Sequence, residues 1–273
     1  MIAQFAGAVA IACYLLACVF LYRALATHSK PSKMLILSLG ALALPLHGMQ
    51  ILTQVYQYNG INLGFFNVLS LVGWIIACLH IAICSYRPLL VMSLFAYPAA
   101  AFGLLASLLF YAPYQVLSHL PQGAESHIIL SIFAYSVLFL AALHAILLAI
   151  QNKNLKNHRL KTKNPLLNIM PPLQTMEVVL FDFIMFGFIL LSLAIISGFI
   201  TLDDIFAQHV LHKTVLTIFA WFIFGTLLVG HYWQGWRGQR AVKFTLIGFS
   251  FLLVGFLGSK FVLEFILHSA YMR

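Results

Sequence analysis

The sequence predicts an all-α fold, a polytopic membrane helix bundle of about eight transmembrane helices with both the N-terminus and the C-terminus outside. Three observations lead to this fold class: 63% of the 273 residues are hydrophobic, only 8% are charged, and the mean hydropathy is +0.99. Soluble domains usually contain about 25% charged residues, so these values exclude a soluble globular domain. We therefore expect a single integral membrane domain, 1–273, embedded in a lipid bilayer.

The first half of the chain contains four apolar stretches close to the ~20 residues that cross a bilayer core. They run over 2–26, 34 to about 58, 62–85 and 89–111. No positive residue precedes the first stretch, so we expect it to stay in the mature protein instead of being cleaved as a signal peptide. Pro45 interrupts the second stretch beside His47, and neighbouring helices are expected to satisfy the carbonyl that this proline frees.

The second half contains four more apolar stretches. We expect spans over 127–150, from about 176 to 201, from Lys213 to the region of His231, and over 244–268. Residues 151–175 contain five cations and no acid, and they are expected to form a cytoplasmic loop between a five-helix part and a three-helix part. Glu177 lies at the start of the sixth span, where the helix dipole favours a carboxylate, and Asp182 lies deeper.

The cations give this arrangement a direction. With eight spans and both ends outside, twelve of the fifteen Lys and Arg residues fall into cytoplasmic segments, as the positive-inside rule requires. They are Arg23, Lys30, Lys33, Arg87, Lys153, Lys156, Arg159, Lys161, Lys163, Arg237, Arg240 and Lys243. This distribution indicates membrane topology, so no nucleic-acid partner is expected from the net charge of +9.

The histidines are predicted to form two layers. In this topology His127 and His268 lie at the outer ends of their spans, whereas His80, His144 and His231 lie toward the inner ends. A neutral imidazole is a good axial ligand for haem iron, and an apolar bundle suits a flat macrocycle. Single interfacial histidines are more often anchors or hydrogen-bonding groups, so the histidines of the loops receive no functional role. No nucleophile with its base, phosphate loop or paired carboxylates is recognisable, and we expect no enzyme.

Several motifs, taken in order, resemble the cytochrome c assembly protein family. The runs IMPPLQTMEVVLFDFIMFGFILLSLAIISGFI, HIILSIFAYS, GHYWQGWRGQR and HSAY are similar to its proline-led span, its histidine-opened helix, its GWRG turn and its closing histidine-serine. The resemblance covers about residues 60–270 and is strongest to the small YpjD-like or HemX-like branch of the bacterial inner membrane. It implies haem as cofactor, with outer ligands at His127 and His268 and a membrane-embedded ligand at His231. It also implies another membrane protein of cytochrome c biogenesis as a partner.

One segment departs from the haem-delivering members of this family, which have a tryptophan-rich WWD segment between the sixth and seventh spans. Here this position reads LDDIFAQHVLHK, and no tryptophan lies between Trp74 and Trp221. Three functions therefore stay open. The first is haem handling for cytochrome c biogenesis, and the second is a cofactor-free accessory or regulatory membrane subunit. The third, ranked lowest, is an ion or small-solute transporter using Asp182 and Lys260.

Overall fold

The structure, a computed structural model, confirms the all-α membrane fold. It describes residues 2–57, 60–110, 123–156, 170–201 and 208–261. Within these ranges eight helices are long and apolar enough to cross a membrane. The outward orientation of the two termini stays a prediction from the charges.

The helices group by their contacts into two compact units. Unit 1 comprises residues 1–118 with 161–171, and unit 2 comprises 119–160 with 172–273. The single membrane domain with a five-helix and a three-helix part stays a prediction, and residues 157–169 of the expected basic loop lie outside the described ranges.

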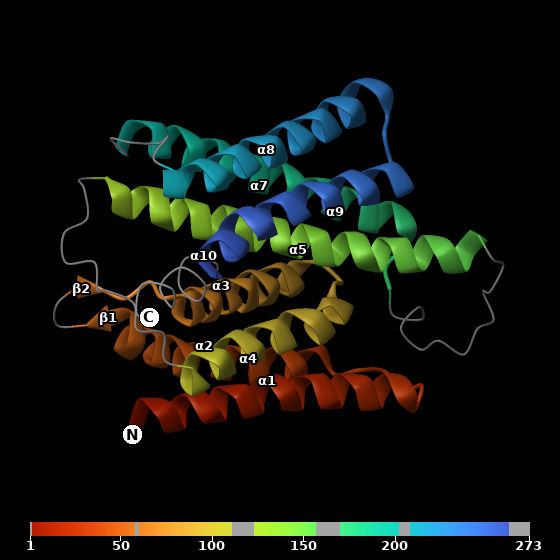
Figure 1. Cartoon of the computed structure of the whole chain (residues 1–273). Helices are drawn as coiled ribbons and strands as arrows, with labels where there is room; N and C mark the ends of the chain where they lie inside the picture. The colour runs from red at the N-terminus through yellow and green to blue at the C-terminus, as the bar shows by residue number, and fades with distance from the viewer. Residues whose placement is uncertain (1, 58–59, 111–122, 157–169, 202–207, 262–273) are drawn as a thin grey trace. The chain divides into compact units, whose positions relative to one another are not determined.

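Unit 1 is a bundle of four membrane helices, drawn from red to olive in Figure 1. Helix α1 packs against α2 and α4, and α3 packs against α2 and α4. The elements are α1 (Ile2–Ala26), α2 (Lys33–Val55), β1 (Tyr56–Gln57), β2 (Gly60–Ile61), α3 (Phe65–Tyr86), the 3₁₀ turn η1 (Leu90–Met92) and α4 (Ser93–Leu109). The short strands β1 and β2 pair antiparallel between α2 and α3.

Buried small residues and two tyrosines form the core of unit 1. Ala10, Ala17 and Ala43 are fully buried, and they surround the Tyr14 and Tyr97 rings, whose centroids lie 5.4 Å apart. Small side chains let membrane helices approach closely, since lipid supplies no hydrophobic drive for helix association. Buried apolar residues thus fill the interior of unit 1, while its outer surface is suited to lipid.

Helix α2 continues through Pro45, which frees the carbonyl of Ala41 four residues earlier, and a donor from a neighbouring helix reaches a different carbonyl close to the proline. The Trp74 indole N–H of α3 donates to the Leu44 carbonyl at 2.9 Å. His47 does not serve a carbonyl: its Nε2 lies 3.0 Å from the Ser70 hydroxyl, and its Nδ1 lies 3.5 Å from the Tyr14 hydroxyl.

Unit 2 contains the other four membrane helices, from green to blue in Figure 1. Helix α5 packs along α7 and α9, and α8 packs along α7 and α9. The elements are α5 (Ala124–Lys156), α7 (Leu173–Thr201), α8 (Gln208–Gln234), α9 (Gln239–Leu253), the π-helical segment η3 (Val254–Gly258) and α10 (Ser259–Phe261). Most of these helices begin or end a turn beyond the expected limits, because polar residues at their ends continue the helical hydrogen bonding.

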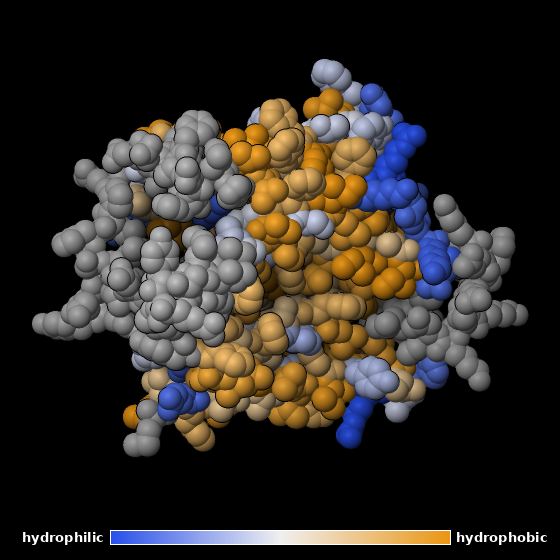
Figure 2. Space-filling view, viewed as in Figure 1, coloured by the Kyte–Doolittle hydropathy of each residue, from blue (hydrophilic) through white to orange (hydrophobic). Residues whose placement is uncertain are grey.

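The surface of unit 2 is apolar along the middle of its helices. Figure 2 shows orange side chains over α8 and α9 and blue ones where α8 turns into α9. Large hydrophobic side chains such as Phe186, Phe219 and Phe222 are about half exposed, which suits contact with lipid chains. Tyr232 and Trp233 are exposed near the end of α8, the position that aromatic residues favour at a membrane interface.

Candidate functional site

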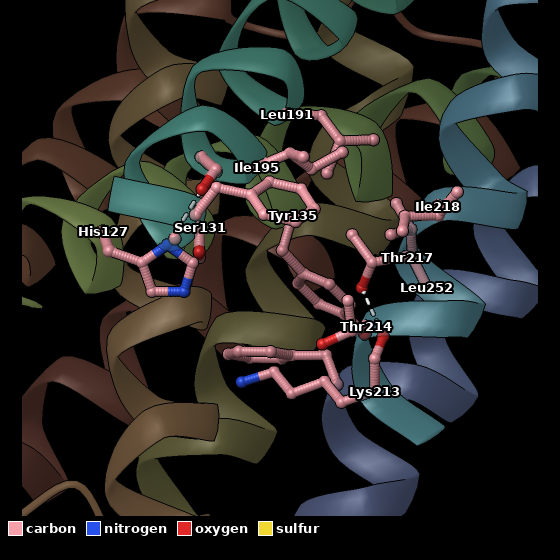
Figure 3. A pocket seen from close by; sticks show the side chains of 14 residues that line it. His127, Ser131, Tyr135, Leu191, Ile195, Lys213, Thr214, Thr217, Ile218 and Leu252 are labelled. Atoms are coloured by element: carbon pink, nitrogen blue, oxygen red, sulfur yellow. Dashed lines mark hydrogen bonds between the residues drawn. The ribbon is translucent and has the colours of Figure 1, made fainter. Parts of the chain in front are cut away.

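A pocket in unit 2 lies between the start of α5, the end of α7, the start of α8 and the end of α9 (Figure 3). Its volume is about 120 Å³. Apolar side chains dominate the lining, and a few polar groups converge on it. The residues that line it are His127, Ser131, Tyr135, Leu191, Ala194, Ile195, Gly198, Phe199, Lys213, Thr214, Thr217, Ile218, Leu252 and Phe256.

His127 enters this pocket from the first turn of α5. Its Nδ1 lies 2.9 Å from the Ala194 carbonyl and 3.3 Å from the Ser197 hydroxyl. A carbonyl only accepts, so Nδ1 carries the proton of the neutral ring, and Nε2 keeps its lone pair. The ring approaches α7 at Gly198, where any side chain would meet it, since a Cβ there would lie 2.9 Å from His127 Cε1. The glycine is therefore required for the position of the imidazole.

Lys213 contributes the cation of the pocket from the start of α8. Its ammonium group lies 5.1 Å from the centre of the Phe256 ring, a cation–π distance, and its carbonyl accepts a hydrogen bond from the Thr217 hydroxyl at 2.8 Å. Phe256 lies in the π-helical segment η3, and such segments are frequent at functional sites. Figure 3 shows His127 and Lys213 reaching the pocket from different helices, with Tyr135 between them.

His231 lies on α8, three residues before the helix ends at Gln234. Its Nδ1 lies 2.9 Å from the Trp236 carbonyl, so this ring also has its proton on Nδ1 and its lone pair on Nε2. Its ring stacks on Phe181 of α7 with centroids 3.5 Å apart and planes 17° apart. The chain turns just beyond it at Gly235, whose φ of 66° is a left-handed conformation that glycine adopts without strain.

The histidines of unit 2 lie at two levels, as predicted. His127 contacts Ala194 near the end of α7, whereas His144 Nε2 lies 2.8 Å from the Met176 carbonyl near its start. At ~1.5 Å per residue, positions 176 and 194 are about 27 Å apart along the helix. His231 lies at the level of Phe181, so the structure does not bring His127 and His231 together. His268 lies outside the described residues.

Several residues around these sites had no assigned role in the sequence. Lys213 and Tyr135 join His127 only through tertiary packing of helices far apart in the chain. Glu177 accepts a hydrogen bond from the Gly238 backbone N–H at 2.9 Å, a contact that the helix dipole alone does not predict. In unit 1, His80 is buried with its Nε2 2.8 Å from the Ser93 hydroxyl.

The transporter alternative depends on Asp182 and Lys260. Asp182 is exposed on α7, and the Lys260 side chain is outside the described part of the structure. Among the described residues, no group of three or more His, Cys, Asp or Glu side chains is arranged to hold a bare metal ion.

Comparison with known proteins gives one family. Residues 34–267 match the sequence profile of the cytochrome C assembly protein family. The inner membrane protein YpjD of Escherichia coli strain K12 is 34% identical over 210 residues, which cover 76% of this chain and 78% of that protein. An uncharacterized 28.8 kDa protein of Azospirillum brasilense is 27% identical over 169 residues, covering 60% of this chain and 61% of that one. No solved structure matches the chain.

Proposed function

The chain belongs to the cytochrome c assembly protein family, and from this premise we propose that it binds and handles haem for cytochrome c biogenesis. It is a multi-pass protein of the inner membrane, in agreement with its eight membrane-length helices and its inner-membrane relative. The proposed role is non-enzymatic: the protein binds the cofactor and presents it to another membrane protein of the assembly pathway.

The orientation of two imidazoles carries this proposal. His127 and His231 each hold Nδ1 against a backbone carbonyl at 2.9 Å, which leaves Nε2 as the nitrogen with the lone pair. Histidines that ligate metals almost always donate their other ring N–H to a carbonyl or carboxylate, since this fixes the ring and raises its basicity. Haem, when bound, would supply the iron. His127, together with His268, is proposed as the outer pair, and His231 as the inner ligand.

The volume of the pocket beside His127 limits how haem could be held there. Pockets that enclose small molecules usually measure about 300–1,000 Å³, so the 120 Å³ beside His127 does not enclose a porphyrin. The donor atoms fit haem iron, whereas the closed volume does not fit the whole macrocycle. We therefore propose that haem is cargo held at the mouth of this pocket, where the Lys213 ammonium group suits a propionate.

An absorption spectrum of gently solubilised protein, expressed with ample haem, tests the proposal. Wild type is expected to show a Soret band, and a His127→Ala, His231→Ala double variant is expected to lose most of it. His28→Asn is the matched control: His28 is exposed, and its φ of 52° is a conformation that asparagine tolerates. A wild-type protein without any Soret band would contradict haem binding.

A cofactor-free accessory role is the second candidate, and the small volume of the pocket favours it. In that case the protein would stabilise another membrane protein, for example an enzyme of haem synthesis. Purification with such a partner, unchanged in the double histidine variant and without a haem spectrum, would select this role. A transporter ranks lowest, because the exposed Asp182 does not line a described cavity.

A further inference from the structure

The turn between α8 and α9 contains a second pocket of unit 2, with a chemistry different from that at His127. It has a volume of about 430 Å³, within the usual range for small-molecule sites. It is lined by the turn itself, Gln234 to Arg240, and by Asn152 from the last turns of α5. Two guanidinium groups, Arg237 and Arg240, line it, and no acidic residue does.

Contacts from α7 and α8 hold this turn. The Gly238 N–H donates to the Glu177 carboxylate at 2.9 Å, and the Trp236 indole N–H donates to the Gln234 side-chain oxygen at 2.9 Å. The Trp236 ring lies directly against Gly230, where a Cβ would overlap it. The Arg240 guanidinium lies 5.8 Å from the centre of this ring. A charged group of the pocket is thus positioned by a fixed aromatic surface.

Backbone donors face the same turn. Helix α9 has 15 residues, and its first helical bond runs from the Val242 N–H to the Gly238 carbonyl at 3.1 Å. The N–H groups of residues 239–241 therefore have no acceptor within the helix, and they lie at the positive end of its dipole. Such an arrangement favours an anion with several acceptor oxygens.

Asn152 supplies the independent observation. Its side chain is only 9% exposed, it lines the pocket, and its amide nitrogen lies 3.7 Å from the position that a Gly238 Cβ would take. Among the described residues it makes no hydrogen bond. Its amide atoms are not among the fully enclosed side-chain atoms that lack a partner, so they keep access to the pocket that the residue lines. A ligand oxygen in the pocket would satisfy this amide together with the two arginines.

We propose that this pocket binds the phosphate of an anionic lipid headgroup. Arginine forks suit phosphate oxygens, and basic pockets at the ends of membrane helices bind anionic headgroups. A lipid is favoured as the source because the pocket lies between two membrane spans, 213–234 and 239–258. Trp233, which is 85% exposed just before the turn, marks the depth of the membrane interface, where lipid phosphates are found.

Native mass spectrometry of the detergent-purified full chain tests the inference. Separate samples are incubated with phosphatidylglycerol, with phosphatidylcholine and with inorganic phosphate. Wild type is expected to retain phosphatidylglycerol in preference to the other two. Arg240→Gln is expected to weaken this retention roughly tenfold, which corresponds to one hydrogen-bonded charge. Asn152→Leu is expected to weaken it as well.

Lys243→Gln is the matched control, because Lys243 is an exposed cation one turn after Arg240 on α9 and does not line the pocket. If Lys243→Gln weakens lipid retention as much as Arg240→Gln does, the lipid binds a diffuse basic surface, and the proposed pocket is contradicted. If inorganic phosphate binds as well as phosphatidylglycerol, the proposal that the bound phosphate belongs to a lipid is contradicted. Should Asn152→Leu fail to fold, the comparison of Arg240→Gln with Lys243→Gln still decides. None of these residues is a proposed haem ligand, so a failed haem spectrum leaves this inference standing.

Discussion

Glu177 connects two parts of unit 2 that lie 61 residues apart in the sequence. Its position near the start of α7 is explained by the helix dipole, yet its carboxylate also binds the Gly238 N–H. Gly238 has a φ of 57° and a ψ of −125°, a conformation that side chains rarely allow. The carboxylate therefore fixes the turn that carries both the His231 contact and the second pocket.

The first prediction concerns this carboxylate. Glu177→Ala removes a charge-assisted hydrogen bond in a partly buried place, and it is expected to lower the free energy of unfolding by about 1–3 kcal/mol. Glu177→Gln retains an acceptor oxygen, so its loss is expected to be smaller. Unfolding in detergent, followed by tryptophan fluorescence, measures both. Glu125→Ala is the control, since Glu125 is exposed in the first turn of α5. Equal losses in the Glu177→Ala and Glu125→Ala variants would show that only the dipole matters.

Individual side chains were predictable from the sequence only where a motif marked them. His127 and His231 follow recognisable motifs, and each lies at a helix end with an oriented ring. Lys213 and Asn152 look like ordinary polar residues at the ends of spans. Their roles depend on helices that meet only after folding, so no local pattern could have indicated them.

At the scale of helices, glycines set the approach of α3 and α4. A Cβ on Gly103 would lie 2.6 Å from the Leu69 carbonyl oxygen, and one on Gly73 would lie 2.9 Å from the Ala100 Cα. Both obstacles are backbone atoms, which cannot rotate away as a side chain can. Each helix thus offers a glycine to the backbone of the other, the close packing that small residues permit in membranes.

The second prediction compares two glycines of unit 1. Gly103→Ala forces α3 and α4 apart and is expected to destabilise the protein by about 1–3 kcal/mol. Gly48→Ala meets only the Trp74 side chain at 3.5 Å, an ordinary contact, so the better helix propensity of alanine should leave stability unchanged or raise it by up to about 1 kcal/mol. Thermal unfolding of the two variants in the same detergent measures the difference. Equal effects would mean that the helix contact is not tight.

The helices themselves were largely predictable, because a bilayer core demands about 20 apolar residues and the sequence supplies eight such stretches. The first and last residues of the helices were less predictable. The last long helix begins at Gln239, five residues before the expected start, since Gly238 ends the turn and the next five residues, three of them polar, are already helical. The strand pair at 56–61 was missed because two-residue strands leave no period in a sequence.

At the scale of the whole molecule, charge is the only guide to direction. In an eight-span topology, twelve of the fifteen cations are predicted to fall in segments on one side. The positive-inside rule then predicts that both termini lie outside and that the turn at Arg237 and Arg240 lies in the cytoplasm. It also predicts that the His127 pocket lies at the outer face, because His127 contacts the opposite end of α7 from His144.

The third prediction follows from this charge distribution. Alkaline phosphatase, which is active only outside the inner membrane, is expected to be active when fused after Arg273 and inactive when fused after Lys161. Green fluorescent protein, which fluoresces only inside, should give the opposite result. Eight crossings require the two termini to lie on one side, so an epitope tag placed before Met1 should be removed by a protease added to spheroplasts, in agreement with the C-terminal fusion. Disagreement between the two ends would contradict the number of spans. If both ends lie inside, the number of spans stands but the direction is reversed. The His127 pocket would then face the cytoplasm, where the ligands that we propose for haem outside the membrane would have no use.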